Sequence, residues 1–343
     1  MILILIRGLN LVKIIVGYLL SRITGKTIHF GNPVAVSIEP TNCCNLHCPE
    51  CPAGMQKLTR TKGFMQPELF HSIIDQLYPH LSYLTLYFQG EPYLNRHIFD
   101  FITLSRSKNI FVATSTNGHF LDELSVRQTI ESGLNQLIIS LDGTDQENYE
   151  IYRKGGNFSK VISGIRLLVN EKKRLKKKTP QIILQCLILR SNEHRLRAIR
   201  KLGKEVGVDK ITFKTAQFYD YENGNPLMPE TQKYSRYKEI NELKIQNSKL
   251  KTSAHQHIST SSHYRIKNPH RNSCFRMWSS CVVTWDGKVV PCCFDKDARH
   301  LLGDLEKNSF NEIWRNKTYD EFRMQILKDR RSVGICNNCF QTF

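Results

Sequence analysis

Short apolar runs alternate with amphipathic helical segments between residues 34 and 215, and this alternation restricts the folds that the chain can adopt. Six runs have the length and composition of buried strands, at 34–39, 83–89, 110–116, 136–142, 181–189 and 210–215. Helical periodicity lies between them, at 67–78, 95–107, 122–132, 158–175 and 193–206. No antiparallel hairpin signal joins these strands, so the sequence predicts a parallel sheet with right-handed crossovers.

Six strand–helix units are too few for a closed eight-stranded barrel. The sequence therefore predicts an α/β fold, either a partial, open (β/α)6 barrel or a doubly wound sheet, with functional residues at the carboxyl ends of the strands. Residues 216–272 are polar and have little apolar periodicity, which predicts a connecting region with one helix near 230–247. The other expected parts are an N-terminal helix (1–31), the barrel (32–215) and a small cysteine-rich unit (273–343).

The eleven cysteines are bunched rather than spread along the chain. They gather at 43–51, 274–293 and 336–339, and Cys186 stands alone. In a chain of 343 residues this clustering indicates metal ligation in a reducing compartment rather than a disulfide framework. We therefore expect a cytoplasmic protein.

The first cysteine group directly follows the first predicted strand. Cys44, Cys48 and Cys51 have the spacing C-x3-C-x2-C, and three thiolates in one loop can hold a cubane iron–sulfur cluster with one iron left open. An open coordination position is typical of a catalytic metal site, whereas a zinc or redox loop is the alternative. Adjacent cysteines rarely reach one cubane together, so we interpret Cys43 as a small buried apolar residue.

The stretch Glu39-Pro-Thr-Asn-Cys-Cys-Asn-Leu-His-Cys-Pro-Glu-Cys-Pro52 resembles the cluster loop of radical S-adenosylmethionine (radical SAM) enzymes. In that family three cysteines hold a [4Fe-4S] cluster whose fourth iron binds SAM. The resemblance implies a partial TIM-like barrel and reductive cleavage of SAM to methionine and a 5'-deoxyadenosyl radical, which removes a hydrogen atom from substrate. It also implies a reductant such as flavodoxin or ferredoxin.

Residues that follow later strands resemble the SAM-binding positions of the same family. Glu91, in Gly-Glu-Pro, would accept hydrogen bonds from the SAM amino group. Ser140 and Arg153 resemble the pair that binds the SAM carboxylate, a task that suits a guanidinium, although Arg153 can also be a surface helix-cap arginine. Asn117 can reach the ribose or the methionine portion of SAM, or it can serve only as a turn residue. The same interpretations apply to Asp142.

The second cysteine group resembles a SPASM domain, an extension of many radical SAM enzymes that carries auxiliary iron–sulfur clusters. Its hairpin is expected over 282–290 and turns at an Asp-Gly pair. The resemblance implies one auxiliary [4Fe-4S] cluster, with spare or alternate ligands at Cys281 and Cys293, whereas a zinc ribbon is the competing interpretation. The four expected cluster ligands are Cys274, Cys292, Cys336 and Cys339.

The first twenty residues form an apolar segment with a narrow polar stripe. Its polar and small residues recur at spacings of three and four, at Arg7, Asn10, Lys13, Gly17 and Ser21. Two charges argue against a membrane-spanning helix, and no small-residue cleavage site follows. Two alternatives remain open: an interfacial helix on the inner face of a membrane, aided by Arg7, Lys13, Arg22 and Lys26, or a helix packed on the barrel or on a partner chain.

The net charge of +18 favours an anionic partner. Fold and cofactor do not identify the substrate. Oxidation or rearrangement of a small or lipid-linked metabolite, or peptide modification, all suit a radical SAM oxidoreductase or a related enzyme. The contrasting hypothesis is a non-catalytic iron–sulfur or zinc protein that binds nucleic acid or another anion, although nucleic acid is not the partner we expect.

Overall fold

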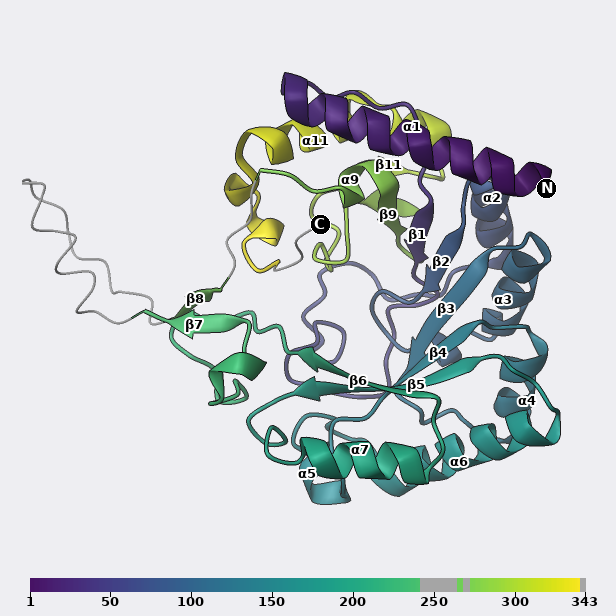
Figure 1. Cartoon of the computed structure of the whole chain (residues 1–343), viewed down its shortest axis with the longest axis vertical. Helices are drawn as coiled ribbons and strands as arrows, with labels where there is room; N and C mark the ends of the chain where they lie inside the picture. Colours follow the sequence, from purple (N-terminus) through teal and green to yellow (C-terminus); the bar gives the residue numbers. More distant parts are fainter. Residues whose placement is uncertain (241–263, 268–271, 340–343) are drawn as a thin grey trace, which may run out of the picture.

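The computed structural model describes residues 1–240, 264–267 and 272–339 (Figure 1). Nine strands form one sheet in the order β11-β10-β9-β1-β2-β3-β4-β5-β6. All neighbouring pairs from β1 to β6 are parallel. The six strands are β1 (Ala35–Ile38), β2 (Tyr83–Leu86), β3 (Phe111–Thr116), β4 (Gln136–Ser140), β5 (Gln181–Ile188) and β6 (Lys210–Thr215).

Strands β1 to β6 lie side by side in chain order, which is the arrangement of a barrel wall. A doubly wound sheet would reverse its strand order at a switch point, and no reversal occurs here. The prediction of a partial, open barrel is therefore confirmed. Every expected strand is present, with ends that differ by at most three residues from the predicted bounds.

Helices cover the outer side of this wall (Figure 1). Each predicted helix between the strands is confirmed, and local sequence explains where they begin: Asp122 and Ser125 form a capping box, and Asn157 accepts from the Lys160 amide. The sequence did not reveal α5 (Gln146–Glu150), because five residues are too few for a periodic signal. The other helices are α2 (Pro67–Leu77), α3 (Ile98–Ser107), α4 (Glu123–Glu131), α6 (Phe158–Arg174) and α7 (Leu196–Glu205).

The cysteine-rich tail continues the same sheet. Strand β9 (Ser280–Val283) pairs in parallel with β1, and the expected hairpin to β10 (Lys288–Val290) turns at Gly287, whose φ is 79°. Strand β11 (Gly303–Asp304) adds an edge. Three helices complete the tail: α9 (Arg276–Ser279), α10 (Phe310–Trp314) and α11 (Lys317–Asp329).

The connection before the tail differs from its prediction. Over residues 230–240, the described part of the helix expected near 230–247, the structure instead has a 3-10 turn at Gln232–Tyr234 and strand β7 (Tyr237–Glu239), which pairs with β8 (Tyr264–Ile266). Residues 241–247 lie outside the described part. Tyr237 is fully buried and its hydroxyl bonds to Phe218 and Asn338, so tertiary contacts determine the local conformation.

The N-terminal helix α1 (Ile2–Thr24) packs on the barrel and the tail (Figure 1). Within the described residues it alone is long and apolar enough to cross a membrane, with a mean hydropathy of 2.0. Arg7, one of the four basic residues named for the membrane alternative, is used in packing. Its guanidinium donates to the main-chain oxygens of Pro79, Lys108 and Asn109, so it is used to hold α1 on the barrel.

Candidate active site

The loop that follows β1 opens into a cavity of about 680 Å³ at the carboxyl ends of the strands, here called the mouth cavity. Seven residues that the sequence singled out line it together: Cys44, Cys48, Cys51, Glu91, Asn117, Ser140 and Arg153. They follow or end five different elements, β1, β2, β3, β4 and α5, so the parallel sheet is what brings them to one place. Cys43 does not line the mouth cavity, and it is half-buried rather than buried as expected.

The donor chemistry around the mouth cavity suits a bound iron–sulfur cluster. Within residues 1–240, 264–267 and 272–339 no three His, Cys, Asp or Glu side chains form a compact metal-binding group. The three thiols nevertheless influence one another: burial raises the pKa of Cys44 to about 12, and Glu91, Cys51 and Cys48 add to this rise. Thiolates that are buried together need a positive partner, and cluster iron would supply it.

Glu91 joins the cysteine loop to the end of β3. Its carboxylate accepts the Asn117 amide at 2.7 Å and the Thr116 hydroxyl at 2.8 Å, and its own amide donates to Cys43 O at 2.8 Å. Burial raises the pKa of Glu91 to about 7 despite these donors. The preceding Gly90 has a φ of 74°, and a Cβ there would lie 2.5 Å from Thr41 O, which explains why glycine is required.

Asn117 also reaches the cysteine loop. Its side-chain nitrogen, Nδ2, donates to Asn45 Oδ1 at 2.7 Å and lies 4.0 Å from Cys44 Sγ. Its side-chain oxygen, Oδ1, accepts the His119 main-chain amide. The side chain therefore has more than a turn role, because it links two loops at the rim of the mouth cavity.

Arg153 is held in the mouth by an acidic partner. Its Nε donates to Asp142 Oδ2 at 2.6 Å, and its Nη1 lies 3.9 Å from Cys48 Sγ. Burial opposes the charge on Arg153, but Asp142 and Cys48 outweigh burial and its pKa is raised. This placement is not that of a surface cap. Asp142, expected in the same class as Asn117, does not line the cavity and instead positions Arg153.

Three basic residues also line the mouth cavity, and sequence reasoning missed them. Lys214 at the end of β6, Arg236 before β7 and Lys296 after β10 line the mouth cavity with Cys293. The sequence did hold a signal for Lys214, because this residue stands near the carboxyl end of an expected strand. No comparable local signal marks Arg236 or Lys296, because the chain fold alone brings them to the mouth.

The second cysteine group encloses a smaller cavity, here called the tail cavity. All four expected ligands line it: Cys274, Cys292, Cys336 and Cys339. Burial raises the pKa of Cys336 to about 11, while Arg330 opposes and Cys274 and Cys339 reinforce this rise. Arg330 is buried and its Nη2 donates to Cys339 Sγ at 3.4 Å, so a cation already lies beside these sulfurs.

The two cysteines expected as spare ligands lie elsewhere. Cys281 is a core residue of β9 and Cys293 faces the mouth cavity, where its sulfur accepts from Arg276 at 3.6 Å. Neither lines the tail cavity. Cys292 and Cys293 lie in the bend that follows β10, where Cys292 lines the tail cavity and Cys293 lines the mouth cavity.

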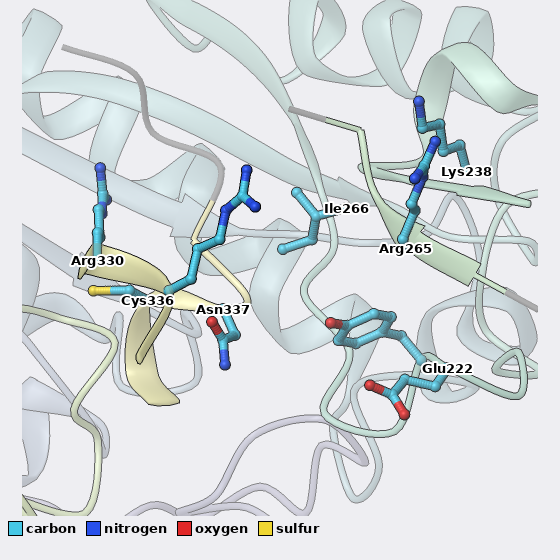
Figure 2. A pocket seen from close by; sticks show the side chains of 9 residues that line it. Glu222, Lys238, Arg265, Ile266, Arg330, Cys336 and Asn337 are labelled. Carbon is cyan, nitrogen blue, oxygen red and sulfur yellow. The ribbon is translucent and has the colours of Figure 1, made fainter. Parts of the chain in front are cut away.

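A further cavity of about 480 Å³ lies on the outer side of Cys336 (Figure 2), and we call it the outer cavity. Basic side chains dominate its walls, with Lys238 and Arg265 on the β7–β8 pair and Arg330 and Arg331 on the tail. Glu222 is the one acidic residue among the described residues that line it. The outer cavity and the tail cavity share Arg330 and Cys336.

Comparison with known proteins identifies the class of this fold and site. The family model for the radical SAM superfamily matches residues 38–184, and the model for SPASM, an iron-sulfur cluster-binding domain, matches residues 274–340. The chain belongs to the radical SAM superfamily and carries a C-terminal SPASM domain. It is an enzyme, and its cofactors are [4Fe-4S] clusters and SAM.

Named relatives share about a fifth of their residues with this chain. The "tungsten-containing aldehyde ferredoxin oxidoreductase cofactor-modifying protein" of Pyrococcus furiosus is 22% identical over 322 residues, 88% of this chain and 86% of that protein. An "AdoMet-dependent heme synthase" of Methanosarcina barkeri is 23% identical over 329 residues, 90% of this chain and 88% of that protein.

Solved structures agree on the fold. Streptococcus suis SuiB bound to S-adenosylmethionine has a TM-score of 0.62 at 13% identity, covering 90% of this chain and 72% of that one. The radical SAM family model and the names of the sequence relatives describe enzymes, so the alternative of a non-catalytic nucleic-acid-binding protein is not supported.

Proposed function

We propose that the enzyme binds SAM and an anionic substrate together in the mouth cavity. The observation that carries this proposal is the lining of the cavity, which combines two groups of residues. One group has the three loop cysteines with Glu91, Asn117, Ser140 and Arg153, and the other is basic, with Lys214, Arg236 and Lys296.

In this proposal Cys44, Cys48 and Cys51 hold the catalytic [4Fe-4S] cluster. When bound, the cluster and SAM supply a 5'-deoxyadenosyl radical that removes a hydrogen atom from substrate. Asp142 holds the Nε edge of Arg153, which leaves the Nη groups for the SAM carboxylate beside Ser140. Glu91 and Asn117 fix the rim of the loop and offer the acceptors that the SAM amino group needs.

An anionic substrate would neutralise the ammonium charges of Lys214 and Lys296. Among the described residues no carboxylate forms a salt bridge with Lys214 or Lys296, although Lys296 Nζ lies 5.1 Å from the centre of the Tyr219 ring. Burial lowers the pKa of both lysines, the direction expected for an ammonium without a close counter-charge. A carboxylate or phosphate on the substrate would neutralise the two lysines, because charge-assisted hydrogen bonds are strong.

The test measures substrate-dependent formation of 5'-deoxyadenosine by the reconstituted enzyme with dithionite. Cell metabolites separated by anion exchange serve as the probe, and the stimulating fraction should be retained on the column. Replacing Lys214 or Lys296 by glutamine should lower the stimulation by roughly 10- to 100-fold, the loss of one charged hydrogen bond. Lys210→Gln is the matched control, because Lys210 is an exposed lysine at the amino end of the same strand and does not line the mouth cavity. Stimulation by neutral fractions, or equal losses in the control, would contradict an anionic substrate.

We also propose two partners for this enzyme, a reductant and a membrane. A small acidic electron carrier such as flavodoxin or ferredoxin would be the reductant, and the basic outer cavity beside Cys336 suits its charge (Figure 2). The enzyme would work in the cytoplasm at the inner face of a membrane, for which α1 gives the structural basis.

A further inference from the structure

The helix α1 has its polar stripe turned toward the molecule. Asn10 Nδ2 donates to Asn32 O at 2.8 Å and Asn10 Oδ1 accepts the Asn32 amide at 2.8 Å. Ser21 makes the same two-way contact with the main chain of Ile28, at 2.9 and 2.8 Å. Together with the three bonds of Arg7, these contacts use three polar side chains of the stripe to fix the helix, whereas Lys13 is exposed.

Close packing reinforces this placement. Ile14 and Tyr18 are buried, and the Tyr18 ring makes edge contacts with Phe275 and Trp278 at 5.2 and 5.3 Å between centroids. A Cβ on Gly31 would come within 2.5 Å of Ile14 Cγ1, so the chain passes tightly under the helix. The helix α1 is therefore a fixed part of the fold.

The opposite side of α1 is exposed and almost wholly apolar. Residues on this side are at least 37% exposed, which reverses the pattern of an ordinary surface helix. Soluble monomers rarely expose a continuous apolar face of this extent. We call it the α1 apolar face, and it comprises Met1, Ile2, Ile4, Leu5, Leu9, Leu11, Val12, Ile15, Val16, Leu19, Leu20 and Ile23.

The charges around this face decide what can cover it. No acidic residue occurs before Glu39, and Lys13, Arg22 and Lys26 are exposed. At about 100° per residue, Lys13 and Arg22 fall on opposite edges of the α1 apolar face. A second copy of the same face would bring like charges together, whereas anionic lipid headgroups complement them.

We propose that the α1 apolar face docks the enzyme in the interface of a bilayer that contains anionic phospholipid. The helix lies in the plane of the membrane, its aliphatic side chains enter the acyl boundary, and the basic side chains at its edges meet the headgroups. This inference specifies the membrane association proposed above and is independent of the substrate class.

Docking in this way sets the direction of the mouth. The carbonyls that accept from Arg7 precede β2 and β3, at the amino ends of these strands. The mouth cavity lies at their carboxyl ends, and β3 alone spans roughly 20 Å at about 3.3 Å per residue. The mouth therefore faces water, so the reacting part of the substrate enters from the aqueous side.

The test uses the reconstituted full chain and vesicle co-sedimentation. Vesicles of phosphatidylcholine with phosphatidylglycerol should bind the protein, and vesicles of phosphatidylcholine alone should bind it more weakly. Leu5→Gln with Val12→Gln should weaken binding at least about tenfold, since each loses a buried aliphatic side chain, and glutamine keeps the helix. Leu124→Gln with Leu301→Gln removes two exposed leucines elsewhere and should bind as the wild type does.

Hydrogen exchange on the vesicle-bound protein tests the orientation. Protection is expected at the loops before β2 and β3 and not at the loops that line the mouth. Equal binding by the α1 variant, no binding by the wild type, or a stable dimer that the α1 variant abolishes would each overturn the proposal. SAM cleavage is measured in parallel without vesicles, so a failure of the proposed function is separate from a failure of docking.

Discussion

Replacing Cys48 by alanine should abolish reductive SAM cleavage and remove about four irons from the reconstituted protein, the content of one cubane cluster. Cys48 is 4% exposed, lines the mouth cavity and lies 3.9 Å from Arg153 Nη1. Its loss would leave only two loop thiolates for the cluster. Iron counting after anaerobic reconstitution and chromatography of 5'-deoxyadenosine formed with dithionite measure both effects.

The matched variant is Cys43→Ala, one of the adjacent pair of cysteines. The main-chain oxygen of Cys43 accepts the Glu91 amide and its main-chain amide is held by Thr41 Oγ1, whereas its side chain does not line the mouth cavity. Alanine preserves both main-chain contacts, so iron content and SAM cleavage should stay near the wild-type values. Equal losses in the two variants would show that the proposed ligand set is wrong.

Replacing Cys336 by alanine should lower the iron content from about eight to about four per chain, since two cubane clusters hold eight irons. Cys336 is buried in the tail cavity with the other three expected ligands, and Arg330 lies against this group. We expect the protein to lose stability as well, because Arg330 would keep its buried charge while losing Cys336, one of its sulfur partners. Iron counting and thermal unfolding under anaerobic conditions measure the two effects.

Cys281→Ala is the control for the tail. It removes a buried thiol from β9 that does not line the tail cavity, so about eight irons should remain. The expected cost is a modest loss of packing, on the order of 1 kcal/mol for one small buried group. One zinc and about four irons in the wild-type protein would instead identify the tail as a zinc site, the competing interpretation of its cysteine spacing.

The sequence was sufficient to predict the barrel wall and the residues of the mouth that follow strands β1 to β4. Strand-length apolar runs marked β1 to β6, and the rule that parallel strands share a carboxyl end brought together residues as distant as Cys44 and Arg153. Two basic residues of the mouth, Arg236 and Lys296, could not be predicted in this way. Lys296 reaches the mouth only because β9 pairs with β1, and no local pattern encodes a pairing between segments so far apart.

The same limit applies to α1. Periodicity correctly gathered Arg7, Asn10 and Ser21 on one stripe, but it could not tell which way the stripe faces. Polar stripes commonly face solvent, and here main-chain acceptors from Pro79, Lys108 and Asn109 draw Arg7 inward. Periodicity reports which residues share a face, whereas tertiary partners decide which face is outside.

The pairing of β9 with β1 ties the maturation of the enzyme to the end of its synthesis. Strand β1 is made early, but its second neighbour is β9, which leaves the ribosome only after most of the chain has been translated. Glu39, the residue that begins the cysteine loop, donates its amide to Val283 and accepts the Trp285 amide. A nascent chain therefore carries an open sheet edge beside an incomplete cluster loop until residues 280–285 emerge. Iron–sulfur insertion into the mouth should therefore wait until residues 280–285 have emerged and β9 has paired with β1.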